Sequence, residues 1–133
     1  MKLRILIADD HEVVRRGLCT LLQTHEGWEV CGEAEDGRVA IEKVRQFHPD
    51  VVVLDWQMPV MDGLEAAKEI RRLAPSTILL MITLHDSVQL AETAHAAGIN
   101  QVLSKSDDIA EHLIASLKDV TTATTIASAE HSS

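Results

Sequence analysis

The sequence of 133 residues is poor in aromatic side chains and in positive charge. It has two tryptophans, one phenylalanine and no tyrosine. We interpret Trp28 and Trp56 as packing residues, because two isolated rings make no platform for stacked nucleic-acid bases. Twelve lysines and arginines stand against 21 aspartates and glutamates, a formal net charge of -9. This balance argues against binding of a nucleic-acid backbone or an anionic membrane.

Cysteine and long apolar runs are also scarce. Cys19 and Cys31 have no metal-ligand spacing to each other or to a histidine, so we expect buried free thiols in a reducing cytosol. No apolar run reaches the roughly 18 residues of a membrane-spanning helix. The start, MKLRILIADDHE, turns acidic too early for a signal peptide. We therefore expect a cytoplasmic protein with no membrane span.

The length suits one domain, since a chain of this size buries roughly two-thirds of its unfolded surface. Short apolar runs alternate with longer stretches of helical periodicity. The expected strands are residues 3–8, 30–34, 51–54, 78–83 and 101–104. The expected helices are residues 12–24, 38–47, 63–74, 87–97 and 108–120. This alternation predicts an α/β fold, a doubly wound five-stranded parallel sheet with five helices on its two faces.

Local patterns add detail to this prediction. The runs VVVL and ILLMIT are apolar without alternation, which is typical of a strand covered on both faces. Gly98 is placed to end the helix at 87–97 in a left-handed conformation. Residues 121–133 carry a single apolar side chain beyond their alanines. We therefore predict a domain over residues 1–120 and a flexible tail or linker over 121–133.

Four of the predicted strands end in polar or charged side chains. The first is followed by Asp9 and Asp10, and the third, fourth and fifth lead to Asp55, Thr83 and Lys105. Because the carboxyl ends of parallel strands share one edge, we expect these side chains to converge there. An Asp pair before a helix is often only an N-cap. Matching residues at four strand ends nevertheless favour a site.

Neighbouring carboxylates repel one another, and a divalent cation or the Lys105 ammonium can relieve that repulsion. Mg²⁺ prefers oxygen ligands and typically takes one or two carboxylates together with phosphate oxygens. A cation, an ammonium and the Thr83 hydroxyl around Asp55 would neutralise charge on phosphoryl oxygens, which is the main demand of phosphoryl transfer. Aspartate is a known covalent phosphoryl acceptor. The pattern therefore indicates Mg²⁺-dependent phosphorylation of an aspartate.

Four segments carry a resemblance to a known family: ILIADDHEVVRRGL, VVVLDWQMPVMDGLEAAKEIR, LLMITLHD and AAGINQVLSKS. They resemble the CheY-like receiver domain of bacterial two-component response regulators. The spacing also matches, with 28 positions from Asp55 to Thr83 and 22 from Thr83 to Lys105. The resemblance covers about residues 2–120 and implies the flavodoxin-like strand order 2-1-3-4-5. DDHEVVRRGL and LSKS are most similar to the NarL/LuxR-type branch.

The resemblance implies that Asp55 is the phospho-acceptor and that Thr83 and Lys105 each bind a phosphoryl oxygen. Bonds to a phosphoryl group would pull the loops after the fourth and fifth strands and so switch an output. The resemblance also implies a Mg²⁺ site. Its ligands would be the side chains of Asp10 and Asp55, the backbone carbonyl of Gln57 and, mostly through water, Asp9.

Some positions depart from the family pattern or leave its consequences open. The aromatic residue that often stands three positions before the lysine is replaced by Val102, which we expect to serve as packing because it has no ring to rotate. Position 106 is serine rather than proline. His85 is interpreted as a solvated loop residue, and the other histidines as surface or incidental residues. Asp62 is expected to cap the helix at 63–74.

Two other functions fit the sequence less well. An aspartate-nucleophile phosphatase needs a second carboxylate two residues after the nucleophile, where this chain has Gln57. A flavin- or nucleotide-binding domain needs a Gly- or Ser/Thr-rich phosphate loop after the first strand, and the carboxylates of ADDHEV would repel a phosphate. We therefore expect a signalling domain that catalyses its own phosphorylation and dephosphorylation, and no enzyme that acts on a separate substrate.

The expected partner is a sensor histidine kinase, which would donate the phosphoryl group. The chain is also a candidate for homodimerisation. The sequence has no recognition helix with clustered Arg and Lys, so this domain itself is not expected to bind nucleic acid. We expect the output to be transcription, through a DNA-binding effector outside this chain. The alternative is a stand-alone receiver that signals by protein–protein contact.

Overall fold

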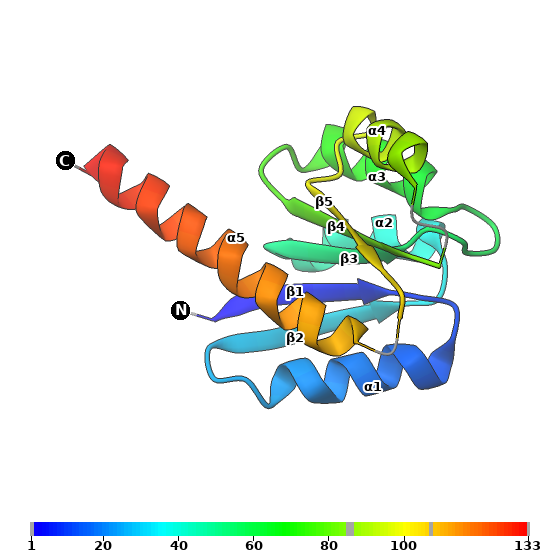
Figure 1. Cartoon of the computed structure of the whole chain (residues 1–133), viewed down its shortest axis with the longest axis horizontal. Coiled ribbons are helices and arrows are strands. Elements are labelled where there is room, and N and C mark those ends of the chain that lie inside the picture. Colours follow the sequence, from blue (N-terminus) through cyan, green and yellow to red (C-terminus); the bar gives the residue numbers. More distant parts are fainter. Residues whose placement is uncertain (1, 85–86, 107, 133) are drawn as a thin grey trace.

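The computed structural model describes the backbone of residues 2–84, 87–106 and 108–132, and the side chains of these residues as far as 120. Five parallel strands form one sheet, and a helix follows each strand (Figure 1). The strands are β1 (Leu3–Ala8), β2 (Trp28–Ala34), β3 (Val51–Asp55), β4 (Ile78–Thr83) and β5 (Gln101–Ser104). The helices are α1 (Glu12–Gln23), α2 (Gly37–Phe47), α3 (Gly63–Leu73), α4 (Val88–Ala96) and α5 (Ile109–Ser132). The strand order is β2-β1-β3-β4-β5, which confirms the predicted doubly wound fold.

Helices cover both faces of the sheet. α1 and α5 pack on one face, where Leu18 and Leu113 share a buried cluster with Ile7 of β1. α2, α3 and α4 cover the other face, where Val44 shares a buried cluster with Leu6 of β1. Neighbouring residues of one strand thus enter opposite clusters. Burial on both faces explains why the central strands are apolar without alternation.

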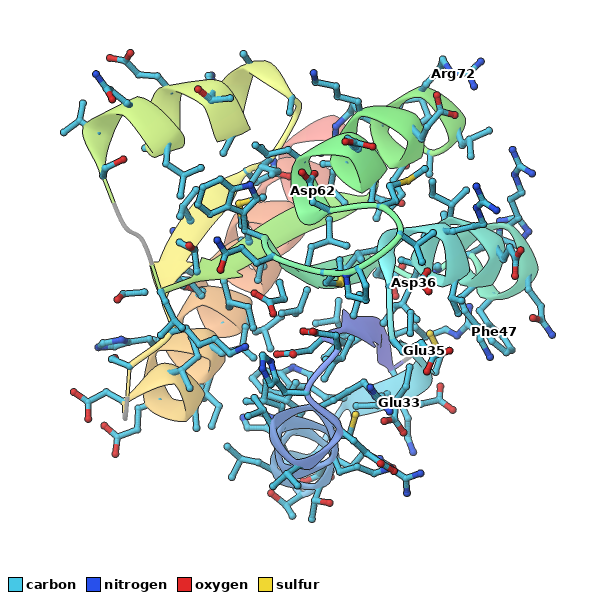
Figure 2. All side chains as sticks on the ribbon, turned by 90° about the vertical axis from the view of Figure 1, so that its right-hand side faces the viewer. Glu33, Glu35, Asp36, Phe47, Asp62 and Arg72 are labelled. Atoms are coloured by element: carbon cyan, nitrogen blue, oxygen red, sulfur yellow. The ribbon has the colours of Figure 1, made fainter. Side chains whose placement is uncertain are left out.

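Side chains fix where several helices begin. Asp36, Asp62 and Ser87 each accept a hydrogen bond from the backbone N–H three residues later, at the starts of α2, α3 and α4. Figure 2 shows Asp36 and Asp62 at these helix starts. The predicted cap at Asp62 is therefore confirmed. Gly98, just beyond α4, has a φ of +96°, which confirms the predicted left-handed ending.

β2 begins at Trp28, two residues earlier than expected. Trp28 is buried and lies opposite Leu3 of β1, and its ring stacks on His25 with the ring centroids 3.7 Å apart. The expectation missed this start because the exposed Glu29 interrupts the apolar run. Trp28 and the partly buried Trp56 both pack against the core, as predicted.

The two cysteines differ in exposure. Both are free thiols, and Cys19 is buried as expected. Burial and, to a smaller extent, the nearby Glu33 carboxylate raise the pKa of Cys19 to about 11. Cys31 is only partly buried, contrary to the prediction, because it lies on the edge strand β2, which has a neighbour on one side only.

α5 is longer than the sequence indicated. We expected a helix over 108–120 and a tail beyond it, but the helix continues to Ser132. Residues 109–132 contain neither glycine nor proline, so nothing in the sequence breaks the helix after Val120. Figure 1 shows the C-terminal turns of α5 extending away from the sheet. The division at residue 120 and the flexibility of the last segment stay predictions. Within the described part of the chain, no helix is both long and apolar enough to cross a membrane.

Candidate functional site

The carboxyl ends of the strands bring the expected polar residues to one edge, the edge that faces the viewer in Figure 2. Lys105, which follows β5, places its Nζ 3.0 Å from Oδ2 of Asp9 and 3.2 Å from Oδ2 of Asp55. These two aspartates come from the ends of β1 and β3, which are neighbours in the sheet. One ammonium therefore bridges two carboxylates from different strands, although 50 residues separate Lys105 from Asp55.

Thr83 is joined to the same group through the backbone. It is the last residue of β4, and its side chain is buried. Its carbonyl oxygen accepts a hydrogen bond of 2.7 Å from the backbone N–H of Lys105. Gln57 lies in the loop after β3 with an exposed side chain, two residues beyond Asp55. Coordination by the Gln57 carbonyl stays a prediction.

Burial and charge shift the ionisation of the central residues. Asp55 is 4 % exposed. Burial and, to a smaller extent, the Asp9 charge raise the pKa of the Asp55 carboxyl, Lys105 opposes both, and the resulting pKa is about 6. Burial alone would lower the pKa of the Lys105 ammonium, but its close contact with Asp9 and the charges of Asp55 and Asp9 outweigh burial and raise it. Lys105 therefore stays a cation beside the two carboxylates.

Several hydrogen bonds hold Asp9 in place. Its N–H donates to the Ala34 carbonyl at 3.0 Å, and its Oδ1 accepts a hydrogen bond of 2.8 Å from the His11 N–H. Its carbonyl oxygen accepts a hydrogen bond of 2.7 Å from Nη1 of Arg15. The N-cap of α1 is His11, with no side-chain cap hydrogen bond, so neither Asp9 nor Asp10 caps this helix. The alternative that the Asp pair is only a helix cap is therefore wrong.

His11 is an exposed surface residue, as expected, but it lies beside the site. Its Nδ1 lies 3.2 Å from Oδ1 of Asp9 and 3.2 Å from Oδ1 of Asp10. The candidate ligand atoms of Asp9, Asp10, His11 and Asp55 all lie within 4.8 Å of one another. The signal in the sequence was its position directly after the Asp pair, where the chain turns from β1 into α1.

The cluster has the donors that a divalent metal ion needs. Oδ2 of Asp9 is buried and makes no hydrogen bond with acceptable geometry within the described residues, although the Lys105 ammonium is near. Such an oxygen can be satisfied by a cation or by water that a cation holds. Three carboxylates within reach of one point therefore suit a hard cation that prefers oxygen ligands.

The loop between β3 and α3 is folded back on the phospho-acceptor candidate. The N–H of Gly63 donates a hydrogen bond of 2.8 Å to the Trp56 carbonyl. A Cβ added to Gly63 would lie 2.5 Å from the carbonyl oxygen of Asp55. Glycine at this position therefore lets the start of α3 approach the end of β3.

Val102 lies three residues before Lys105, and Leu84 directly follows Thr83. Val102 on β5 is partly buried and packs against the cluster beneath α2, α3 and α4, as predicted for a packing residue. His85, expected to be a solvated loop residue, lies outside the described residues. Leu84, which precedes it, is exposed, and it lines an apolar depression of about 340 Å³ together with His11 and Lys105.

The family described as the response regulator receiver domain matches residues 5–118. The chain is 35 % identical to the transcriptional regulatory protein LiaR of Bacillus subtilis, over 87 % of this chain and 56 % of LiaR. It is 39 % identical to a protein-glutamate methylesterase/protein-glutamine glutaminase of Alkalilimnicola ehrlichii, over 79 % of this chain and 27 % of that protein. The chain thus spans about a quarter to about half of the length of these relatives.

Among solved structures, the chain is similar to a two-component response regulator of the LuxR family from Aurantimonas. The TM-score is 0.86 and the identity 31 %, covering 92 % of this chain and 87 % of that one. The receiver domain of a NarL response regulator from Mycobacterium tuberculosis aligns with a TM-score of 0.84 and 32 % identity, covering 91 % and 97 % of the two chains. These neighbours confirm the resemblance to the NarL/LuxR-type branch.

Proposed function

Since this chain belongs to the receiver domain family of two-component response regulators, we propose that Asp55 accepts a phosphoryl group from a sensor histidine kinase in a Mg²⁺-dependent reaction. The observation that carries the proposal is the bridging position of Lys105. Its ammonium lies 3.0 Å from Asp9 and 3.2 Å from Asp55, at the edge where ligands bind in open parallel sheets.

In the proposed transfer, a carboxylate oxygen of Asp55 forms a bond to phosphorus. The bond between phosphorus and the imidazole nitrogen of the donor histidine breaks, and its electron pair stays on that nitrogen. Asp55 must be ionised to attack, and a pKa of about 6 leaves it mostly ionised at neutral pH. A carboxylate with a raised pKa is also the better nucleophile among carboxylates, since nucleophilicity follows basicity.

The surrounding residues stabilise charge on the phosphoryl oxygens. Lys105 is already within hydrogen-bond distance of Asp55 and can move its ammonium to an oxygen of the incoming group. The Thr83 hydroxyl is supplied by the adjacent strand and would donate to a second oxygen. Mg²⁺, when bound by the side chains of Asp10 and Asp55, the Gln57 carbonyl and, through water, Asp9, would neutralise further charge and align the phosphoryl group.

We infer that the chain itself promotes only its own phosphorylation and dephosphorylation. The relative named as a methylesterase matches over 27 % of its length, a portion that in this chain is the receiver domain. Relatives such as LiaR are named transcriptional regulatory proteins. A transcriptional output through a DNA-binding effector outside this chain, a homodimer and a cytoplasmic location are therefore part of the proposal.

Labelling with a small phosphodonor tests the central claim. The 133-residue chain should be phosphorylated by acetyl phosphate in the presence of Mg²⁺, and EDTA should abolish labelling. Asp55→Asn should remove the label, while the matched variant of an exposed acidic residue, Asp119→Asn, should retain it. Undiminished labelling of Asp55→Asn would place the acceptor elsewhere and refute the assignment.

A further inference from the structure

Arg15 of α1 makes contacts that reach back to the end of β1 and across to β2. Its Nη1 donates to the carbonyl oxygen of Asp9 at 2.7 Å, and its Nε donates to Oε1 of Glu33 at 2.9 Å. The Arg15 side chain is 12 % exposed. Figure 2 labels Glu33 on β2, next to α1. One guanidinium therefore ties the β1–α1 turn to the neighbouring strand.

The contact with the Asp9 carbonyl also affects Asp10. The carbonyl of Asp9 and the N–H of Asp10 belong to one planar peptide unit. The Asp9 N–H is fixed by its bond to Ala34, so a donor on the Asp9 carbonyl sets the plane of the next peptide. The direction in which the Asp10 side chain leaves the backbone depends on that plane.

We propose that Arg15 is a positioning residue for the cation site: it holds the Asp9–Asp10 peptide so that both carboxylates are directed toward Asp55 before the cation binds. Glu33 in turn fixes the guanidinium by accepting from its Nε. Arg15 does not touch the cation or the phosphoryl group. The inference rests on the proposed function only in placing the cation among these carboxylates.

The positive charge of Arg15, taken alone, would have the opposite effect on Mg²⁺ affinity. Arg15 is a fixed positive charge beside a cation site, so its charge repels an incoming Mg²⁺. If charge were its only effect, removing it would tighten Mg²⁺ binding. If it positions the carboxylates, removing it weakens binding, because groups that orient ligands typically contribute about 10–100-fold to metal affinity.

Arg16 provides the matched control. It lies on the same helix, carries the same charge and approaches the same Glu33 carboxylate at 3.8 Å, but its side chain is 67 % exposed. Among the described residues, Arg16 pairs with Glu12 and Glu33 and not with Asp9. Arg16→Met therefore reports the loss of one charge near the site without loss of the contact to the β1–α1 turn.

Mg²⁺ affinity of the full 133-residue chain, measured by isothermal titration calorimetry, tests the inference. Arg15→Met should bind Mg²⁺ about tenfold more weakly than wild type, whereas Arg16→Met should bind equally well or slightly more tightly. Arg15→Lys keeps the charge but cannot span both acceptors with one ammonium, so it should show an intermediate loss. Circular dichroism checks that each variant is folded.

The possible results separate the two claims. Folded Arg15→Met that binds Mg²⁺ as tightly as wild type, or more tightly, would overturn the positioning role while leaving phosphorylation of Asp55 intact. If Arg15→Met does not fold, Arg15→Lys decides, and unchanged affinity in that variant would overturn the role. Wild-type protein that binds no Mg²⁺ would refute the proposed cation site itself, and the positioning role with it.

Discussion

The backbone N–H of Lys105 donates a hydrogen bond of 2.7 Å to the carbonyl oxygen of Thr83, while the Lys105 ammonium lies 3.2 Å from Asp55. The two residues that we expect to bind phosphoryl oxygens are thus joined to each other, and Lys105 also contacts the acceptor. Thr83 leads toward α4, and Lys105 follows β5. This backbone hydrogen bond can transmit a pull on one of them to the other, with no aromatic side chain involved.

This linkage predicts how the protein responds to a phosphoryl mimic. Addition of beryllofluoride with Mg²⁺ should shift backbone NMR signals from Asp55 through Thr83 into α4 and β5, while Val102 continues to serve as packing. Thr83→Ala should reduce the shifts in α4 and retain those in the loop after Asp55. Shifts confined to the metal ligands and that loop in the wild type would show that no relay to α4 exists.

The raised pKa of Asp55 predicts that its charge destabilises the metal-free fold at neutral pH. The folded state keeps the proton up to a pKa of about 6, above the ordinary value of 3.8. Between pH 3.8 and about pH 6 the folded state therefore binds more protons than the unfolded state. The stability that the neutral carboxyl contributes is lost as the pH rises through this range. Asp55→Asn, measured by urea unfolding with EDTA, should therefore raise the free energy of unfolding at neutral pH by about 1–2 kcal/mol.

The same measurement across pH provides the control. The gain from Asp55→Asn should shrink as pH falls below the ordinary pKa of 3.8, where the carboxyl is neutral in both folded and unfolded states. Asp119→Asn, at an exposed position of α5, should change the free energy little at any pH. A pH-independent gain would mean that packing of the amide, and not the charge of Asp55, is responsible.

Gly63 predicts a coupling between stability and the site. A Cβ at this position would lie 2.5 Å from the Asp55 carbonyl oxygen, and backbone must move to relieve the contact. Gly63→Ala should lower the free energy of unfolding by about 1–3 kcal/mol and slow labelling of Asp55. In Gly17→Ala, on the exposed side of α1, the new Cβ meets nothing within 4 Å. This control should be neutral or stabilising by up to about 1 kcal/mol, and equal losses in the two variants would contradict the steric explanation.

The acidic composition predicts that the chain itself does not bind DNA. With a net charge of -9 it should repel the phosphate backbone. A mobility-shift titration at physiological salt should show no sequence-dependent complex in the sub-micromolar range. Tight, sequence-dependent binding by these 133 residues would contradict the proposal that DNA recognition belongs to an effector outside this chain.

The sequence by itself determined the positions of the strands, apart from the start of β2, and the residues at the strand ends. Apolar runs separated by amphipathic stretches leave few arrangements other than a parallel sheet covered by helices. In such a sheet the carboxyl ends of the strands meet at one edge, so Asp55, Thr83 and Lys105 could be brought together without knowing a single distance. Local rules also sufficed for the cap at Asp62 and the left-handed Gly98.

Only the tertiary structure decided which side chains hold that edge in place. The contact between Arg15 and Glu33 crosses from α1 to β2 and depends on how β2 pairs with β1, which no local pattern encodes. The nearness of His11 to two carboxylates depends on how the chain turns into α1. The raised pKa of Asp55 depends on burial by neighbours far away in the sequence. These properties arise from long-range packing, because distances between side chains are fixed only when the elements are assembled.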